Sequence, residues 1–441
     1  MTTPLADFLK AYAGAPWARL HMPGHKGRLR GPLAQAAPFD ITEIEGADSL
    51  FEAEGVLRES EENAAALYGS GLTCYSAGGS TLCIQTMVAL TCGPGDRILA
   101  GRNAHHSFLN ACALLDVLPE WILPRYNDSF GVSGELTPEA VADALQRWPD
   151  AKAVYVTSPD YLGCVSDIRA IGELCRRAGK PLLVDNAHGA HLRFTREDRH
   201  PLTLGASLCC DSAHKTLPVL TGGAYLHVSR DYPLERELVK SRMGLFGSTS
   251  PSYLILLSLD LCNAYLAGQA RSDFSRLEEA VQMLCGELGL RPISPRWDFS
   301  KLTLDAWARG MSGEELAGFL RSRGIECEYA ARRHTVLMLS PGNPPEDWAR
   351  LRAALEALPA GEPLREEAEP FRLPERVLTP RRALFAPQER VPVDDALGRI
   401  AGETRIKCPP GVPVVAAGEK IGKDTQKILK ISGIPAINVI K

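Results

Sequence analysis

Short apolar runs alternate with amphipathic stretches between about residues 71 and 228. This alternation is typical of repeated βα units, in which buried strands are separated by helices with one buried side. Apolar strands separated by helices form parallel sheets covered on both faces, so the pattern predicts an α/β fold with a mostly parallel sheet. The predicted strands are GLTCYSA (71–77), DRILAG (96–101), AKAVYVTS (151–158), KPLLVDNA (180–187), ASLCCDS (206–212) and GAYLHVS (223–229). The predicted helices include STLCIQTMVALTC (80–92) and TPEAVADALQRW (137–148), the second with Thr137 as its N-cap.

Composition changes mark the expected divisions of the chain. Residues 1–45 fit the alternation poorly and are expected to form an arm, followed by a large domain at 46–271. A smaller α/β domain is expected at 272–441. Within it, a Pro-, Glu- and Arg-rich stretch near 359–383 reads as a linker, and 406–422 has the turn residues of a hairpin.

Charge and cysteine content exclude several classes of protein. The formal net charge of -4 gives no electrostatic reason to expect a nucleic-acid partner. No apolar run approaches the length that a membrane span needs, and the first residues lack the pattern of a signal peptide. The 12 cysteines form no CxxC pair, which argues against a disulfide framework and against a thiolate zinc site. A cytoplasmic location is therefore expected.

Polar residues follow two of the predicted strands, at the sheet edge where ligands of such folds bind. In AGGST (77–81), glycines let the backbone approach a ligand, and Ser80, Thr81 and the amides of a helix N-terminus can bind a phosphate. The alternative is a plain turn with a capping serine. In GRNAHHS (101–107), His105 can lie flat against a planar ligand, or it can be an ordinary helix-capping or core histidine.

An aspartate ends another strand, in PLLVDNAHGAH (181–191). A carboxylate at Asp185 can pair with a protonated ring nitrogen in a dry pocket. Asp185, His188 and His191 are also metal-ligand residue types. However, the segment lacks the glutamate-bearing helix of zinc peptidases, so the pairing with a ring nitrogen is favoured.

The fourth segment, DSAHKTLPVLTGG (211–223), places Lys215 just after a predicted strand. A lysine is usually a solvated surface charge, but a desolvated one has a lowered pKa and can form a Schiff base. A phosphate cradle, a flat histidine, a strand-end aspartate and a lysine are together the parts of a pyridoxal-phosphate site. The four segments therefore favour covalent chemistry at Lys215.

The chain also resembles the Orn/Lys/Arg decarboxylase family of fold-type-I pyridoxal-phosphate enzymes, in its shorter bacterial form. The segments that carry the resemblance span nearly the whole chain. They are HMPGHKGR, AGGST, GRNAHHS, TSPDYLG, VDNAHGAH, DSAHKTLP, GSTSPSYLILLSLD, WDFSKLTLD and IAGE with CPPGVPVVAAGE. The resemblance implies a fold-type-I large domain with an aspartate-aminotransferase-like, mostly parallel sheet and a smaller C-terminal α/β domain.

The resemblance also implies residue roles. Lys215 would be the Schiff-base lysine, His105 would stack on the cofactor ring, and Asp185 would pair with the ring nitrogen. His188 would lie near the ring hydroxyl or the substrate carboxylate, and His214 would act beside the lysine. The remaining positions implied for the cofactor, chiefly its phosphate, are Gly79, Ser80, Thr81, Ser212, Ser248 and Thr249. The last two would reach the phosphate from a second subunit, so a homodimer with the arm in its interface is the smallest active unit.

Several positions depart from the pattern of the family. They are Asn186 in place of glutamate, Asp160 and Leu162 in place of threonine and an aromatic residue, Gly222 in place of a polar residue, and Cys408 in place of tyrosine. No departure removes an implied cofactor contact. They are expected to bear on substrate selection instead.

The leading hypothesis is decarboxylation of arginine, lysine or ornithine, with loss of carbon dioxide and protonation of the α-carbon by Lys215 or a histidine. Glu403 is the candidate partner for the cationic end of the substrate. Transamination, elimination or decarboxylation of an atypical amino acid would use the same cofactor, because orientation alone selects among them. A silent subunit that binds the cofactor without catalysis is a third hypothesis, which the presence of Lys215, Asp185 and His105 disfavours.

Overall fold

The computed structural model divides into two compact units, each made of two segments of the chain. The residues that the structure describes are 1–364, 371–407 and 412–441. Unit 1 comprises Met1–Leu90 and Pro181–Arg276, and unit 2 comprises Thr91–Lys180 and Leu277–Lys441. These units differ from the expected arm, large domain and small domain, whose boundaries stay a prediction.

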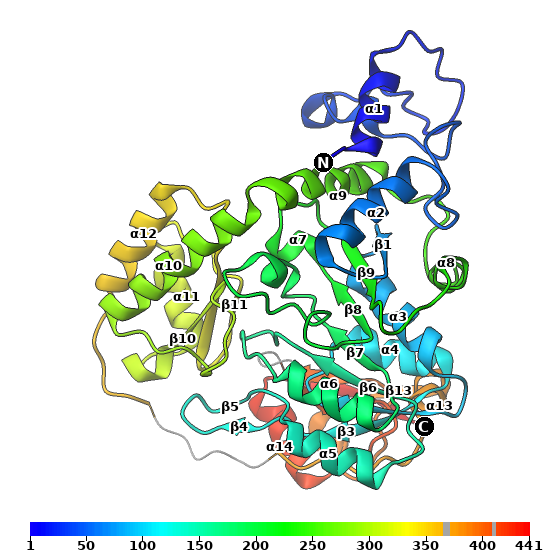
Figure 1. Cartoon of the computed structure of the whole chain (residues 1–441). Coiled ribbons are helices and arrows are strands. Elements are labelled where there is room, and N and C mark those ends of the chain that lie inside the picture. The colour runs from blue at the N-terminus through cyan, green and yellow to red at the C-terminus, as the bar shows by residue number, and fades with distance from the viewer. Residues whose placement is uncertain (365–370, 408–411) are drawn as a thin grey trace. The chain divides into compact units, whose positions relative to one another are not determined.

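Unit 1 contains four buried strands in the order β1-β9-β8-β7 (Figure 1). Their bounds are β1 Leu72–Ser76, β7 Leu182–Asp185, β8 Leu208–Asp211 and β9 Ala224–Val228. Every residue of these strands is buried, which explains why they read as mostly apolar runs. All four were predicted.

One strand is an exception to the mostly parallel pairing that was predicted. β7 and β8 are parallel, with Asp185 opposite Cys210, but β9 is antiparallel to both β8 and β1. Parallel neighbours need a long crossover connection. Between β8 and β9 only residues 212–223 are available, and their one helix, α7 (Ala213–Thr216), has four residues, so the chain returns antiparallel.

The helices of unit 1 begin with the arm. α1 buries Leu5 and Leu9, and the backbone N–H of Ala6 near its N-terminus donates to Asp260 Oδ2 at 2.9 Å. The arm is therefore attached to the rest of unit 1 through α9, which carries Asp260. The helix bounds are α1 Pro4–Gly14, α2 Val56–Tyr68, α3 Gly79–Thr91, α7 Ala213–Thr216, α8 Arg236–Gly244, α9 Tyr253–Gly268 and α10 Ala270–Leu288, of which α3 and α10 run into unit 2.

Unit 2 begins with three parallel strands in the order β6-β2-β3. Thr137 caps the following α5 as predicted, because its hydroxyl accepts from Ala140 N at 3.3 Å. The elements of this segment are β2 Arg97–Gly101, α4 His106–Leu115, β3 Leu118–Ile122, β4 Tyr126–Asn127, β5 Val132–Ser133, α5 Pro138–Arg147, β6 Ala153–Thr157 and α6 Ile168–Arg177. The strand β3 was not predicted, because Pro119 and Glu120 break its apolar run.

The rest of unit 2 holds a separate antiparallel sheet, β10-β12-β11, followed by two short two-stranded sheets. In one of these, β14 pairs antiparallel with β15, in the region where a hairpin was expected (406–422). The elements are β10 Lys301–Asp305, α11 Gly313–Arg321, β11 Tyr329–Ala330, β12 His334–Met338, α12 Pro345–Glu356, α13 Pro380–Phe385, β13 Gln388–Pro392, β14 Arg405–Lys407, β15 Val412–Val415, α14 Lys423–Ile431 and β16 Ala436–Ile440. Buried Val414, Ile421, Leu429 and Val439 form the core of the C-terminal part.

Within the described residues, the 11 cysteines are all free and no helix is long and apolar enough to cross a membrane.

Candidate active site

The turn after β1 and the residue after β8 meet in unit 1. Ser212 Oγ donates to Ser80 Oγ at 2.8 Å, which brings AGGST and DSAHKTLP together. Gly79 begins α3 with a φ of +67°, and a Cβ there would meet nothing within 4 Å. The open space beside the N-terminus of a 13-residue helix leaves room for an anion at Ser80 and Thr81.

Lys215 lies in α7, half-buried, and its Nζ is 3.1 Å from Nε2 of His188. The second residue comes from the loop after β7, so the ends of two neighbouring parallel strands supply this pair. One of the two nitrogens donates and the other accepts. Such a contact fixes the direction of the amine and lets it exchange a proton with the imidazole.

Asp185 ends β7 and is 1% exposed. Its Oδ1 accepts from the backbone N–H of Ala187 at 3.1 Å and from the thiol of Cys210 at 3.7 Å. A buried carboxylate is costly unless it has hydrogen-bond donors or a cation. Asp185 therefore suits a protonated ring nitrogen as a further partner.

Two neighbours of the lysine complete this part of the site. His214 Nδ1 donates to the carbonyl of Gly223 at 2.9 Å, which fixes the ring beside the lysine. Thr216, for which the sequence indicated no role, has a buried hydroxyl without a hydrogen-bond partner among the described residues. A buried hydroxyl of this kind is satisfied by a ligand or by water.

The other candidates are two residues of unit 1 and two residues of unit 2. Ser248 and Thr249 are exposed in the loop after α8. His105, in unit 2, is the N-cap of α4: its Nδ1 accepts from Ser107 N at 3.2 Å, and the side chain is exposed. Glu403, also in unit 2, forms an ion pair with Arg405 at 2.8 Å and accepts from Asn438 N at 2.7 Å.

The departures from the family pattern have structural roles. Asn186 is fully buried and its amide donates to Asp211 Oδ1 at 2.7 Å, so its side chain is held inside unit 1. Gly222 has a φ of +99°, and its carbonyl accepts from Gly79 N at 2.8 Å. Asp160 and Leu162 are both buried in unit 2. That these positions bear on substrate selection stays a prediction, and Cys408 lies outside the described residues.

The donor set of unit 1 fits pyridoxal phosphate. The hydroxyls of Ser80 and Ser212 are hydrogen-bonded to each other, beside the N-terminus of α3 and the open space at Gly79. Such hydroxyl and amide donors bind a phosphate. An amine and an imidazole are paired, and a buried carboxylate ends the neighbouring strand. The residues present therefore match the phosphate, the aldehyde and the ring nitrogen of this cofactor.

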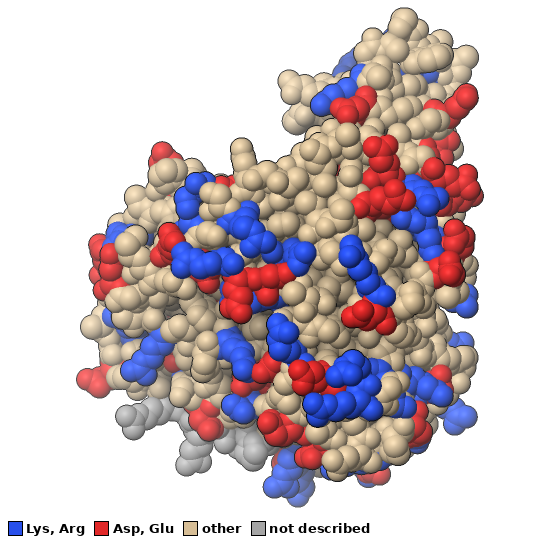
Figure 2. Space-filling model, in the orientation of Figure 1, with Lys and Arg blue, Asp and Glu red and all other residues tan. Residues whose placement is uncertain are grey.

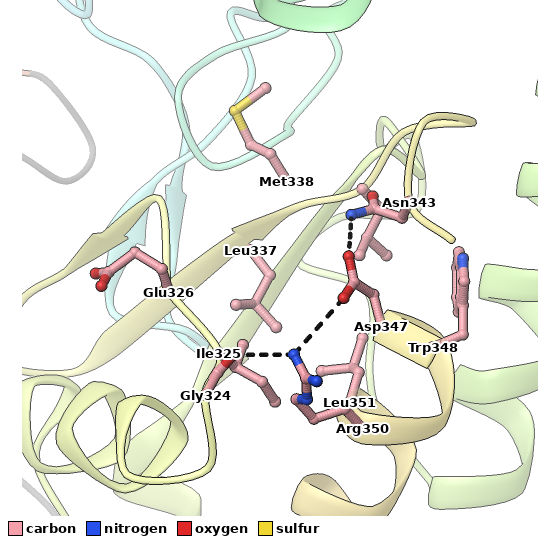
Figure 3. A pocket seen from close by; sticks show the side chains of 11 residues that line it. Gly324, Ile325, Glu326, Leu337, Met338, Asn343, Asp347, Trp348, Arg350 and Leu351 are labelled. Atoms are coloured by element: carbon pink, nitrogen blue, oxygen red, sulfur yellow. Dashed lines mark hydrogen bonds and ion pairs between the residues drawn. The ribbon is translucent and has the colours of Figure 1, made fainter. Parts of the chain in front are cut away.

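A surface pocket of about 270 Å³ lies elsewhere, in unit 2, between β12 and α12 (Figure 3). Leu337, Met338 and Leu351 line it, and Arg350 pairs with Asp347 at 3.7 Å at its side. None of the candidate residues lies in this pocket. Its lining holds no lysine, histidine or cysteine, so it offers no amine, imidazole or thiol for covalent chemistry.

A model of the Orn/Lys/Arg decarboxylase major domain matches residues 3–285, and a model of the C-terminal domain of that family matches residues 365–431. The chain belongs to the Orn/Lys/Arg decarboxylase family. It is 31% identical to a protein of Bacillus subtilis strain 168 named arginine decarboxylase, over 96% of this chain and 92% of the relative. It is 24% identical to lysine decarboxylase LdcA of Pseudomonas aeruginosa, over 57% of this chain and 38% of the relative. Family membership makes the chain an amino-acid decarboxylase, as predicted.

Solved structures confirm the fold. Lysine decarboxylase of Francisella novicida matches with a TM-score of 0.84 at 18% identity, over 100% of this chain and 81% of that chain. A Sphingomonas wittichii serine palmitoyltransferase matches with a TM-score of 0.55 at 14% identity, over 68% of this chain and 75% of that chain. The predicted fold-type-I α/β class is therefore confirmed for this chain.

Proposed function

We propose that this chain binds pyridoxal 5′-phosphate at Lys215 and decarboxylates a basic amino acid, with arginine as the first candidate. The observation that carries the proposal is the contact of Lys215 Nζ with His188 Nε2 at 3.1 Å, beside the Ser80–Ser212 pair and buried Asp185. Arginine is preferred over lysine and ornithine because the relative named arginine decarboxylase matches this chain over nearly its full length. The products would be agmatine and carbon dioxide.

When bound, the cofactor supplies a ring that accepts the electron pair left when the carboxylate departs. The residues of this chain would hold and orient the reactants. Asp185 would keep a proton on the ring nitrogen, and Ser80, Ser212 and the first amides of α3 would hold the phosphate. Lys215 Nζ, directed by His188, would supply the proton that replaces carbon dioxide on the α-carbon.

The cationic end of the substrate requires an acidic partner. Glu403 stays our candidate, although Arg405 holds its carboxylate in this structure. The role requires that the guanidinium of the substrate displace that of Arg405. Glu403→Gln would then raise KM for arginine while leaving kcat less affected, because the carboxylate would act on binding and not on the bond that breaks.

We also propose that a second copy of the chain covers the arm. The arm exposes large apolar side chains, with Trp17 65%, Leu20 92% and Met22 66% exposed. Its segment 18–30 carries exposed cations, at Lys26, Arg28 and Arg30. Segment 43–62 of the same unit carries exposed glutamates, which gather over α2 in the view of Figure 2. The two segments are complementary in charge, so two copies can bury each arm against the acidic segment of the other.

A substrate panel tests the function. Purified protein with pyridoxal phosphate is given arginine, lysine, ornithine and neutral amino acids, and carbon dioxide and amine products are measured. Release of agmatine from arginine is expected. Formation of a keto acid without carbon dioxide would instead support a transaminase.

Reduction with borohydride and peptide mapping test the site itself. The label is expected on Lys215 and is expected to be absent from Lys215→Ala. Lys240, which is buried against Glu61 in the same unit, is the matched lysine that should stay unlabelled. A label on another residue, or no label, would refute the assignment of Lys215 as the Schiff-base lysine. The absence of any label would favour the hypothesis of a silent subunit.

A further inference from the structure

A buried carboxylate beneath the site has no part in the mechanism above. Asp211 ends β8, four positions before Lys215, and is fully buried. Its Oδ1 accepts from Asn186 Nδ2 at 2.7 Å, and its Oδ2 lies 2.9 Å from His200 Nε2. One carboxylate therefore contacts the residue next to Asp185 while lying on the strand that leads to Lys215.

The donors around Asp211 continue into a buried chain of polar groups. His227 Nε2 lies 3.4 Å from Asp211 Oδ2, and its Nδ1 is 2.8 Å from the hydroxyl of Thr73. His200 Nδ1 accepts from Leu202 N, so its Nε2 carries the proton that is donated to Asp211. Burial would raise the pKa of Asp211, but His200 and His227 together hold it below its ordinary value. The residue is therefore an anion surrounded by donors.

The end of β7 is fixed by two bonds to the end of β8. Asn186 N donates to the carbonyl of Cys210 at 3.0 Å, and the Asn186 side chain donates to Asp211. Backbone pairing continues here one residue beyond Asp185, where a parallel ladder would otherwise end. Because Asp185 directly precedes Asn186, any shift of Asn186 moves the carboxylate of the site.

We propose that Asp211 is a positioning residue that acts through Asn186 to hold Asp185 where the cofactor ring nitrogen binds. The inference rests on the proposed role of Asp185. Asp211 touches neither cofactor nor substrate. Its carboxylate accepts the hydrogen bond that fixes the side chain of Asn186. Asp211 lies at the end of β8, the same strand that leads to Lys215.

Exchange of the two side chains tests this. In Asp211→Asn, the new amide group places a donor against the donor of Asn186 or of His200, so one buried donor loses its acceptor. We expect the Kd for pyridoxal phosphate to rise about tenfold and kcat to fall by a similar factor, with a smaller change in KM. In the double variant Asn186→Asp with Asp211→Asn, the amide now on β8 donates to the carboxylate now after β7 and accepts from His200. The Kd should therefore return to within about threefold of that of the natural protein.

Thr73→Val is the matched control. It removes a hydrogen bond at the far end of the same chain of groups and leaves the Asn186–Asp211 contact in place. It should lower the Tm of the apoprotein but leave the Kd for pyridoxal phosphate unchanged. Loss of cofactor affinity in this variant equal to that of Asp211→Asn would show a general effect of stability and would overturn the inference.

The outcomes separate this inference from the proposed function. Failure of the natural protein to bind pyridoxal phosphate refutes the function. Binding by the natural protein with an unchanged Kd in Asp211→Asn refutes the inference alone. If that variant does not fold, the exchanged pair decides: cofactor binding supports the inference, and a pair that fails to fold or to bind overturns it. A stoichiometric divalent metal in the purified protein, lost in Asp211→Asn, would assign His200, Cys209 and Asp211 to a metal site and overturn it as well.

Discussion

Arg102 and Glu419 form a two-point ion pair inside unit 2, with N–O distances of 2.6 and 2.7 Å. The two residues are 317 positions apart, and their side chains are 0% and 2% exposed. Arg102 also donates to the carbonyl of Pro413, and Glu419 Oε2 accepts from Ala416 N at 2.7 Å. The pair therefore joins the segment that follows β2, which leads to His105, to the C-terminal part of unit 2.

Removal of one partner of this pair should be strongly destabilising. Glu419→Ala leaves the guanidinium of Arg102 buried without its anion, and we expect the free energy of unfolding to fall by about 3–5 kcal/mol. Urea unfolding measures this. The control is Glu389→Ala, which removes the exposed pair with Arg399 and should cost less than about 1 kcal/mol. Equal losses of unfolding free energy in the two variants would show that the buried pair contributes no more to stability than the exposed pair.

Ring stacking and helix capping by His105 can be separated. His105→Asn keeps a capping side chain for α4 but removes the aromatic ring, whereas His105→Phe keeps a ring but removes the acceptor for Ser107 N. If the ring stacks on the cofactor, the Asn variant should bind pyridoxal phosphate about tenfold more weakly, whereas the Phe variant should lose about 0.5–2 kcal/mol of stability. Fluorescence titration and thermal unfolding measure the two effects.

The neighbouring His106 provides the control for this experiment. It is exposed at the first position of α4 and neither caps the helix nor has an assigned contact with the cofactor. His106→Ala should leave cofactor affinity unchanged. Equal affinities for pyridoxal phosphate in the Asn and Phe variants of His105 would show that the ring does not stack on the cofactor.

Apolar runs in the sequence were enough to find the strands of unit 1, because those strands are buried along their whole length. Hydrophobic pattern does not encode strand direction, so the antiparallel course of β9 was missed. The direction of β9 is set by the short connection from β8, and the length of this connection can be read from the sequence.

The residues of the candidate site could be proposed from the sequence as far as they lie in local motifs. Asp185 ends a strand, and Ser80 and Lys215 each stand four positions after the end of one. Each of the three therefore lies within one short motif of the sequence. The partners of Asp211 come from positions 200 and 227, and Glu419 meets Arg102 from 317 positions away. Such pairs are fixed by tertiary packing, so no short motif contains both partners. The one feature of the sequence that pointed to the Asp211 contacts was a carboxylate at the end of an apolar strand, in LCCD (208–211).

Charge on the arm offers a test of assembly. Leu20→Asp places an anion on a side chain that is 92% exposed, so the folding of a single chain should not change. If a second copy covers the arm, burial of this charge should shift the protein from dimer to monomer. Sedimentation measures the oligomeric state, and Leu364→Asp, at an exposed position in unit 2, is the control. A dimer that persists in Leu20→Asp would exclude the arm from the interface.

If Ser248 and Thr249 bind the cofactor phosphate of a second subunit, dissociation of a dimer should also lower the affinity for pyridoxal phosphate. Monomeric Leu20→Asp protein should then bind pyridoxal phosphate more weakly than the natural dimer. Ser248→Ala with Thr249→Val should weaken binding without dissociating the dimer. Unchanged affinity in both would confine the phosphate site to the residues of one chain.

Asp160 predicts an unusual dependence of stability on pH. Burial raises the pKa of this carboxyl from 3.8 to about 6, although Lys301 and the backbone N–H groups of Leu162 and Cys164 partly oppose the shift. A raised pKa means that the folded protein holds the proton more tightly than the unfolded chain does. The contribution of Asp160 to stability is therefore fully present below about pH 4 and is lost as the pH rises through 6.

Asp160→Asn removes this titration. The difference in unfolding free energy between the variant and the natural protein should shift in favour of the variant by about 1–3 kcal/mol between pH 4 and pH 7. Asp150→Asn is a control of opposite sign, because a hydrogen bond from Arg97 lowers the pKa of exposed Asp150, whose contribution is lost on acidification. Urea unfolding at several pH values measures both. A difference for Asp160→Asn that stays constant from pH 4 to pH 7 would mean that the carboxyl titrates at its ordinary pKa despite its burial.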